Sequence, residues 1–207
     1  MSDRTLDDKT ILITGGTSGI GLESAAVLAG MGARVIIVGR DAGRLAQAQA
    51  TIKARSGADA AAYLCDFASF ASVRQLADQV LRDVPKLDVL INNAGAVFAR
   101  RTLTTDGLEA TFAVNHLAPF LLTHLLLPRM RETAFATEAR VVHVSSASVY
   151  DPNADHSLVR EEQADPADAA DTERVRWLNA YGRTKRMSEN VVALEAPERS
   201  LILRPRR

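Results

Sequence analysis

The sequence predicts an α/β fold in which helices cover both faces of a doubly wound parallel sheet of about six strands. Three observations predict it. Short apolar runs rich in β-branched residues recur along the chain, amphipathic helical patterns separate them, and a glycine-rich turn follows the first run. Such alternation of strand and helix is typical of βαβ units, whose strands lie parallel in one sheet.

Five apolar runs are predicted to form buried strands, because apolar residues occupy both faces of each run. They are ILIT (11–14), RVIIVG (34–39), AAYLCD (61–66), LDVLIN (87–92) and RVVHVSS (140–146). Their lengths are those of ordinary strands.

Two helices are predicted from apolar residues that recur at helical spacing. The first would bury Ile20, Val27, Leu28 and Met31, and the second would bury Val73, Leu76, Val80 and Val84. Gly32 supplies a stop signal after the first helix.

A further helix is expected over residues 107–130, and it contains Pro119. A proline has no N–H to donate to the carbonyl four residues earlier, which here belongs to Asn115. We expect that carbonyl to be available to a water, or the helix simply to kink at this point.

The composition predicts one soluble globular domain over residues 1–207, since 47% of the residues are hydrophobic and 24% are charged. Lys and Arg total 25, as do Asp and Glu, so no long-range field favours nucleic acid. The N-terminus has no secretory apolar core, and LAPFLLTHLLLP is too short to span a bilayer. We expect a cytoplasmic protein without a membrane or nucleic-acid partner.

Metal binding and disulfide formation are not expected. Cys65 is the only cysteine, and the four histidines match no metal-ligand spacing.

An acidic segment interrupts the α/β pattern at residues 151–176, where eight acidic residues face three arginines. We expect a long surface loop there. It is either a solvated connection or a lid over a functional site, because long loops in compact domains often carry function.

The sequence TGGTSGIG (14–21) follows the first strand and opens a helix, as in the Rossmann-type dinucleotide-binding turn. Glycines there allow a sharp turn and a close approach to a pyrophosphate, and the helix N-terminus presents unpaired N–H groups. A purely structural turn is the alternative. The residues expected to contact the cofactor are Gly15, Thr17, Ser18, Gly19, Ile20 and Gly21.

The second strand ends at Gly39, and Arg40 follows where many NAD-binding sheets carry an acid that binds the ribose 2′-hydroxyl. A guanidinium favours a 2′-phosphate through charge-assisted hydrogen bonds. The sequence therefore predicts NADP rather than NAD, unless Arg40 only pairs with Asp41.

TGGTSGIG, NNAG (92–95), Asn115, Ser146 and YGRTK (181–185) occur in this order, and with them the chain resembles the short-chain dehydrogenase/reductase family from residue 9 onward. Residues 10–128 look most like the retinol-dehydrogenase-like reductases. From Val142 on, VSSASVYDP, NAYGRTKRMSE and LILRP look like the extended branch, the nucleotide-sugar epimerases and dehydratases. LILRP would form the sixth strand and close the sheet in the order 3-2-1-4-5-6.

The resemblance implies a catalytic set. Tyr181 would be the general acid/base, Ser146 would bind the substrate oxygen, Lys185 would hold the nicotinamide ribose and Asn115 would maintain a proton relay. A tyrosine hydroxyl has an ordinary pKa of about 10, and an ammonium one helical turn away stabilises its phenolate form.

Four more residues match cofactor-contacting positions of the family, and each has a structural alternative. Asp66 would contact adenine or only form a turn. Asn92, Ala94 and Gly95 would meet the cofactor at the end of the fourth strand or only turn the chain.

These observations favour an NADP-dependent oxidoreductase that acts on a small-molecule carbonyl or alcohol. In the family, the position of Pro205 is followed by glycine and by a segment that covers the nicotinamide and builds the substrate pocket, whereas this chain has Arg206 and Arg207 there. One alternative is therefore a truncated, catalytically weak or silent NADP-binding module. The resemblance from Val142 on leaves a second alternative, an epimerase- or dehydratase-like enzyme that acts on a nucleotide sugar. The family also implies homodimers or homotetramers through the helices that carry Asn115 and Tyr181.

Overall fold

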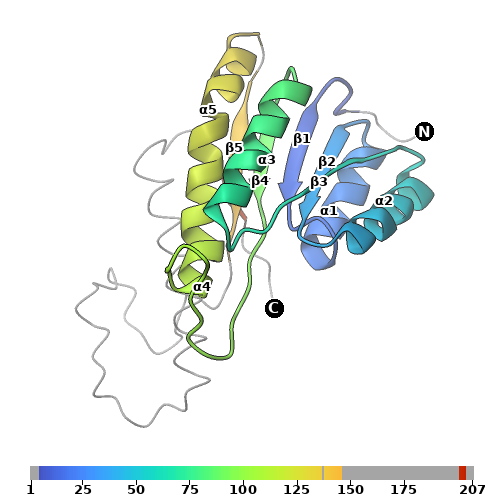
Figure 1. Cartoon of the computed structure of the whole chain (residues 1–207). Helices are drawn as coiled ribbons and strands as arrows, with labels where there is room; N and C mark the ends of the chain where they lie inside the picture. The colour runs from blue at the N-terminus through green and yellow to red at the C-terminus, as the bar shows by residue number, and fades with distance from the viewer. Residues whose placement is uncertain (1–4, 137, 146–200, 204–207) are drawn as a thin grey trace, which may run out of the picture.

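A computed structural model describes residues 5–136, 138–145 and 201–203, and it shows a six-stranded parallel sheet flanked by helices (Figure 1). The strands are β1 (Thr10–Thr14), β2 (Arg34–Gly39), β3 (Ala61–Leu64), β4 (Val89–Asn92), β5 (Arg140–Val144) and β6 (Leu201–Leu203). Their order is β3-β2-β1-β4-β5-β6. The predicted α/β class, the sheet order and the sixth strand are confirmed.

The centre of the sheet is β1, which pairs in parallel with β2 on one side and with β4 on the other. The chain winds outward from β1 to β3, then crosses back to β4 and winds the other way. The strand order therefore reverses between β1 and β4. Open α/β sheets bind ligands outside the carboxyl ends of their strands at this switch point.

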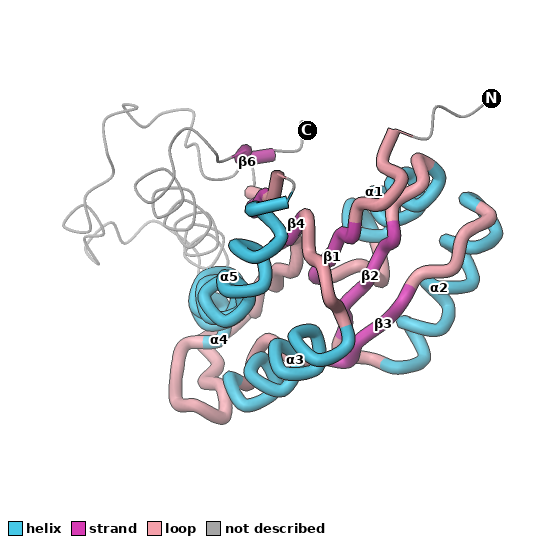
Figure 2. Tube along the Cα trace, turned by 90° about the horizontal axis from the view of Figure 1, so that it is seen from above, coloured by secondary structure: helices cyan, strands magenta, loops and turns pink. Residues whose placement is uncertain are grey.

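Helices cover both faces of the sheet, as seen from above in Figure 2. They are α1 (Gly19–Gly30), α2 (Ala42–Ser56), α3 (Phe70–Asp83), α4 (Ala110–Phe112), the π-helical turn η1 (Ala113–Leu117) and α5 (Ala118–Ala136). α1 and α2 lie together on one face, and α3 and α5 lie together on the other.

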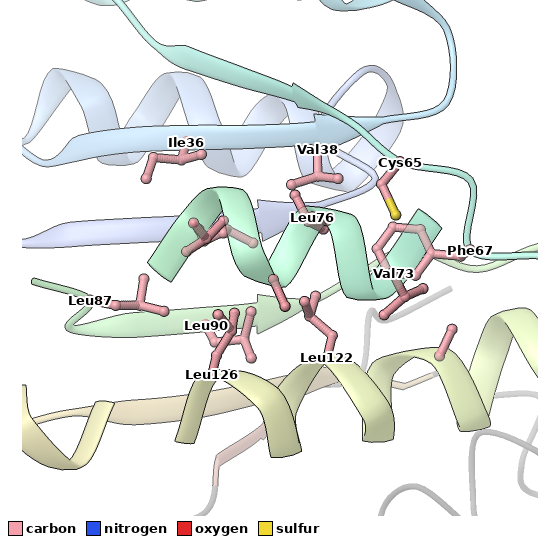
Figure 3. Packing of buried hydrophobic residues seen from close by; sticks show 14 of the residues in the cluster. Ile36, Val38, Cys65, Phe67, Val73, Leu76, Leu87, Leu90, Leu122 and Leu126 are labelled. Carbon is pink, nitrogen blue, oxygen red and sulfur yellow. The ribbon is translucent and has the colours of Figure 1, made fainter. Parts of the chain in front are cut away.

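In the part of the chain that the structure describes, the sheet divides the core into two clusters. Leu12 and Leu90 pack with Leu76 of α3 and Leu122 of α5, a cluster part of which is shown in Figure 3. The second cluster joins Ile11, Ile13, Val35 and Ile37 to α1 and α2. Successive residues of β1 thus enter opposite clusters, which is why apolar residues fill both of its faces.

The prediction for the buried face of α1 is wrong for Ile20 and Val27, whereas Leu28 is half-buried and packs against the second cluster. Ile20 is 49% exposed and Val27 is 57% exposed, whereas the residues buried against the sheet are Gly21, Ala25, Ala26 and Ala29. Small side chains let the helix lie close to the strands, and this close approach excludes the larger residues from the contact.

The prediction that the third strand is buried on both faces is also wrong. Among the strands that the structure describes, β3 pairs only with β2 and forms one edge of the sheet. Its four residues are exposed or half-buried, and Leu64 is 57% exposed. An edge strand has a neighbour on one side only, so apolar composition does not bury it.

The helix expected over residues 107–130 begins at Ala110, because the Glu109 carboxylate accepts hydrogen bonds from the N–H groups of Thr111 (3.0 Å) and Phe112 (2.8 Å). Just before Pro119 the helix contains η1, which ends with a hydrogen bond from Ala118 N–H to the Ala113 carbonyl. A π-helical turn inserts a residue into a helix and is frequent at functional sites.

The run Ala110–Ala134 is 25 residues long, and its most apolar window has a mean hydropathy of 1.4. It is long and apolar enough to cross a membrane, in contrast to what the shorter run LAPFLLTHLLLP suggests. Half of that window is buried inside the protein, and α5 packs against α3. The core helix of a soluble protein can pass the same test of length and hydropathy, so this run is weak evidence for a membrane span.

Candidate functional site

The glycine-rich turn between β1 and α1 is held tightly against the end of β4. Gly15 has a φ of +68°, and its N–H donates to the Val38 carbonyl at 2.9 Å. A Cβ on Gly15 would lie 2.9 Å from the Ala94 Cα, and one on Gly21 would collide with the Gly15 carbonyl oxygen. These two glycines are therefore required by the packing of the protein itself.

Gly19 differs from both, because in the described part of the chain a Cβ there would meet nothing within 4 Å beyond its chain neighbours and its own helix. It has a φ of +51° and is the first residue of α1. Ser18, Gly19 and Ile20 are exposed, and the Ser18 side chain forms no capping hydrogen bond. The N-terminus of α1 thus faces open space, where its N–H groups and helix dipole favour an anion. A pyrophosphate fits this position.

Thr14 and Asn93 fasten the turn to β4. The Thr14 hydroxyl accepts hydrogen bonds from the N–H groups of Asn93 and Ala94, both at 3.0 Å. The Asn93 side-chain amide donates to the carbonyls of Thr14 at 2.9 Å and Gly15 at 3.2 Å. The sequence prediction selected neither residue. The available signal was a polar residue at the carboxyl end of each of two neighbouring parallel strands.

The predicted residues Asn92, Ala94 and Gly95 do not share one environment. Asn92 is buried, and its side-chain amide donates to the Thr123 hydroxyl of α5 at 3.0 Å. Ala94 is half-buried beside Gly15, and Gly95 is exposed. Only Ala94 and Gly95 therefore lie where a ligand above the turn could touch them.

Asn115 lies in η1 and is buried. Its side-chain oxygen accepts from the Ala96 N–H at 2.8 Å, and its side-chain nitrogen donates to the Ala96 carbonyl at 2.9 Å. This pair of hydrogen bonds fixes the chain just beyond Gly95. The expected role of the Asn115 main-chain carbonyl stays a prediction.

Arg40 lies next to the glycine-rich turn. A Cβ on Gly39, the last residue of β2, would lie 2.6 Å from the Thr17 methyl carbon, so Thr17 covers the end of that strand. Arg40 follows and is exposed. Asp41 caps α2 by accepting from the Arg44 N–H at 2.8 Å, and within the described ranges no ion pair joins it to Arg40. A guanidinium beside the turn fits a 2′-phosphate.

Asp66 forms a turn at the end of β3, which confirms the structural alternative for this residue. Its carboxylate accepts from the Ala68 N–H at 2.9 Å, and its carbonyl accepts from the Ser69 N–H at 3.1 Å. Asp66 remains exposed, so its contact with adenine stays a prediction. Burial raises the pKa of the preceding Cys65 thiol to about 11, which keeps it protonated at neutral pH.

Several predicted features fall outside the described residues: Ser146, Tyr181, Lys185, the acidic segment 151–176 and the chain after β6. β5 ends at Val144, and the buried Ser145 follows it directly before Ser146. The epimerase-like resemblance from Val142 onward lies mostly in the same undescribed region and stays a prediction.

Known proteins resemble this chain in sequence and in fold. Human polyprenol dehydrogenase is 41% identical over 145 residues, a match that covers 69% of this chain and 44% of the relative. Mouse retinol dehydrogenase 12 is 43% identical over 139 residues, covering 67% and 43%. The chain thus spans less than half the length of these relatives.

Among solved structures, the Pseudomonas aeruginosa RhlG/NADP complex superposes with a TM-score of 0.74 at 26% identity, covering 100% of this chain and 75% of RhlG. The family model described as short chain dehydrogenase matches residues 9–157. This match covers the glycine-rich turn, the NNAG segment and Asn115, so the chain belongs to the short-chain dehydrogenase family.

Proposed function

We propose that the chain is an NADP-dependent oxidoreductase that transfers a hydride between NADP(H) and a carbonyl or alcohol of a small molecule. One observation carries the cofactor assignment. The open N-terminus of α1 and the exposed Arg40 are brought together by the contact between Thr17 and Gly39. An anion site and a guanidinium side by side suit a dinucleotide with an additional phosphate.

The residues present would hold the cofactor in three places. Ser18, Gly19 and Ile20 would bind the pyrophosphate at the start of α1, Arg40 would bind the 2′-phosphate, and Asp66 would lie at the adenine. NADPH supplies the hydride when it is bound. RhlG, which has the same fold, has been crystallised as a complex with NADP.

The proton chemistry in this proposal belongs to Tyr181, which would donate a proton to the substrate oxygen during reduction and accept it during oxidation. The Lys185 ammonium would favour the phenolate form of Tyr181, and the Ser146 hydroxyl would donate a hydrogen bond to the substrate oxygen. These roles are supported by the family membership.

Asn115 contributes through its hydrogen bonds to Ala96, which fix the chain where it leaves β4. A fixed chain at this edge of the sheet keeps the reacting groups in position.

The test is NADPH consumption by the full chain with a panel of aldehydes and ketones. We expect turnover with the wild type and its loss in Tyr181→Phe. Calorimetry should show that Tyr181→Phe still binds NADPH, because the substitution leaves the glycine-rich turn and Arg40 unchanged. Tight NADPH binding without turnover on any compound would contradict the oxidoreductase and favour a binding module. NAD retained through purification would favour the epimerase-like alternative.

A further inference from the structure

The chain between β4 and α4, residues 96–109, is a folded loop with fixed ends (Figure 1). Asn115 holds Ala96 at its start. Near its other end, the Ala110 N–H donates to the Thr102 carbonyl at 2.8 Å, and Leu103 forms an antiparallel bridge with Glu109. We call residues 96–109 the 96–109 loop.

A tight turn forms the tip of this loop. The Gly107 N–H donates to the Thr104 carbonyl at 3.0 Å, and Gly107 has a φ of +75°. The Thr104 N–H donates to the Leu108 carbonyl at 2.8 Å, which closes the turn. Asp106 lies within it and is exposed.

Asp106 connects the tip to α3. Its carboxylate oxygen Oδ2 accepts a hydrogen bond from the N–H of Phe70, the first residue of α3, at 2.9 Å. Ser69, the N-cap residue, accepts from the Ser72 N–H at 3.3 Å with its own side chain. The start of α3 is therefore capped twice, and the Asp106 cap comes from a residue 36 positions away. Its negative charge also suits the positive end of the helix dipole.

The start of α3 is continuous with the turn at Asp66. The Asp66 N–H donates to the Ser72 hydroxyl at 3.0 Å, and the Ser69 N–H donates to the Asp66 carbonyl at 3.1 Å. Asp66 thus connects to Asp106 through one hydrogen-bonded turn and the Phe70 N–H. Asp66 lies at the end of β3, whereas the 96–109 loop leaves the end of β4. The Asp106 contact joins two distant parts of the sheet edge at which ligands bind.

We propose that Asp106 is a positioning residue that couples binding at the adenine end of the cofactor site to the order of the 96–109 loop. The inference rests on the proposed function, because it takes the adenine to lie at Asp66. A ligand that orders the Asp66 turn also fixes the Phe70 N–H, which donates a hydrogen bond to Asp106. Ligand binding therefore favours the ordered state of the 96–109 loop. This coupling is reciprocal. If ligand binding favours the ordered loop by a certain factor, then breaking the Asp106 contact should weaken ligand binding by the same factor.

Arg100 and Arg101 are exposed within the loop and provide a readout of its order, because trypsin cleaves after arginine. The experiment measures the initial rate of cleavage after these two residues by mass spectrometry, on the full chain. The probes are NADPH and adenosine 2′,5′-bisphosphate, which contains only the adenine half of NADP. The variants are Asp106→Ala and Asp106→Asn. Asp78→Ala, at an exposed carboxylate in the middle of α3, is the matched control.

In the wild type we expect the bisphosphate to slow this cleavage about fivefold, the factor that corresponds to one helix-capping hydrogen bond. Asp106→Ala should lose this protection and bind the bisphosphate about fivefold more weakly. Asp106→Asn should retain most of both effects, since its amide oxygen can still accept from Phe70. Asp78→Ala should behave like the wild type.

A purely structural cap would lower the thermal midpoint of Asp106→Ala but leave its protection by ligand unchanged, and that result would overturn the coupling. Ligand binding measured by calorimetry with no change in wild-type cleavage would overturn it as well, while the proposed function would stand. Absence of binding by both probes would overturn the proposed function, and the coupling with it.

Discussion

Gly19→Ala separates the role of a glycine in the fold from its role in ligand binding. Gly19 has a φ of +51°, so an alanine there costs about 1–2 kcal/mol of backbone strain. Beyond its chain neighbours and its own helix, the added methyl meets no atom of the described residues within 4 Å, and it lies at the exposed start of α1. It should therefore displace the pyrophosphate from the first N–H groups of the helix while the protein still folds.

The expected loss of affinity follows from the hydrogen bonds at stake. Hydrogen bonds to a charged group contribute about 1.5–3 kcal/mol, so the Kd for NADPH should rise roughly 10-fold to 150-fold. Calorimetry measures the Kd, and urea unfolding measures the free energy of unfolding. Backbone strain lowers the free energy of unfolding but is present with and without ligand, so the rise in Kd should report the displaced pyrophosphate.

Gly57→Ala is the matched control. Gly57 has a φ of +75° and lies at the end of α2, and its added Cβ also meets nothing within 4 Å among the described residues beyond its chain neighbours. It should lose a similar free energy of unfolding and bind NADPH like the wild type. If Gly19→Ala binds NADPH within twofold of the wild type, the open side of the turn is not the pyrophosphate site and the reasoning fails.

Three further predictions concern charge, burial and pH. Arg40→Asp should lower the ratio of NADP to NAD affinity at least about tenfold, whereas Arg74→Asp on the exposed face of α3 should not change it, as paired titrations with both cofactors would show. Asp88 is fully buried, accepts from the Thr10 N–H at 2.8 Å and pairs with Lys9 and Lys86. Asp88→Ala should therefore cost about 3–5 kcal/mol in urea unfolding, and Asp88→Asn less, since it keeps an acceptor for Thr10. Burial raises the pKa of the Cys65 thiol from 9.0 to about 11. The buried, protonated thiol therefore contributes fully to the free energy of unfolding below pH 9, and this contribution is lost as the pH rises toward 11. Cys65→Ala should flatten the fall of the free energy of unfolding over this pH range.

The regular elements were predictable wherever local sequence and position in the sheet agree. β2 has the predicted bounds, because RVIIVG is a short β-branched run that becomes buried between two strands. β3 has a similar run, but it lies at the edge of the sheet. The order of the strands is a property of the whole sheet, and a short stretch of sequence does not determine it.

The same limit applies to predicting the candidate site from the sequence. The position of the glycine-rich turn and of Arg40 follows from their place after β1 and β2. The separate roles of the three glycines do not follow from the sequence. Asn93 and Ala94 crowd Gly15, and Asn93 crowds Gly21 together with the Gly15 carbonyl; Asn93 and Ala94 lie more than 70 residues later in the chain. The Asp106 contact with α3 is equally non-local.

The fastening of the turn by Thr14 and Asn93 also affects the kinetics of cofactor binding. The hydrogen bonds that shape the turn are made between protein groups, so we expect the turn to keep this conformation when no ligand is bound. A preorganised site loses little conformational entropy when it binds. Association should therefore be a single second-order step whose rate rises linearly with cofactor concentration, without a plateau set by rearrangement of the turn.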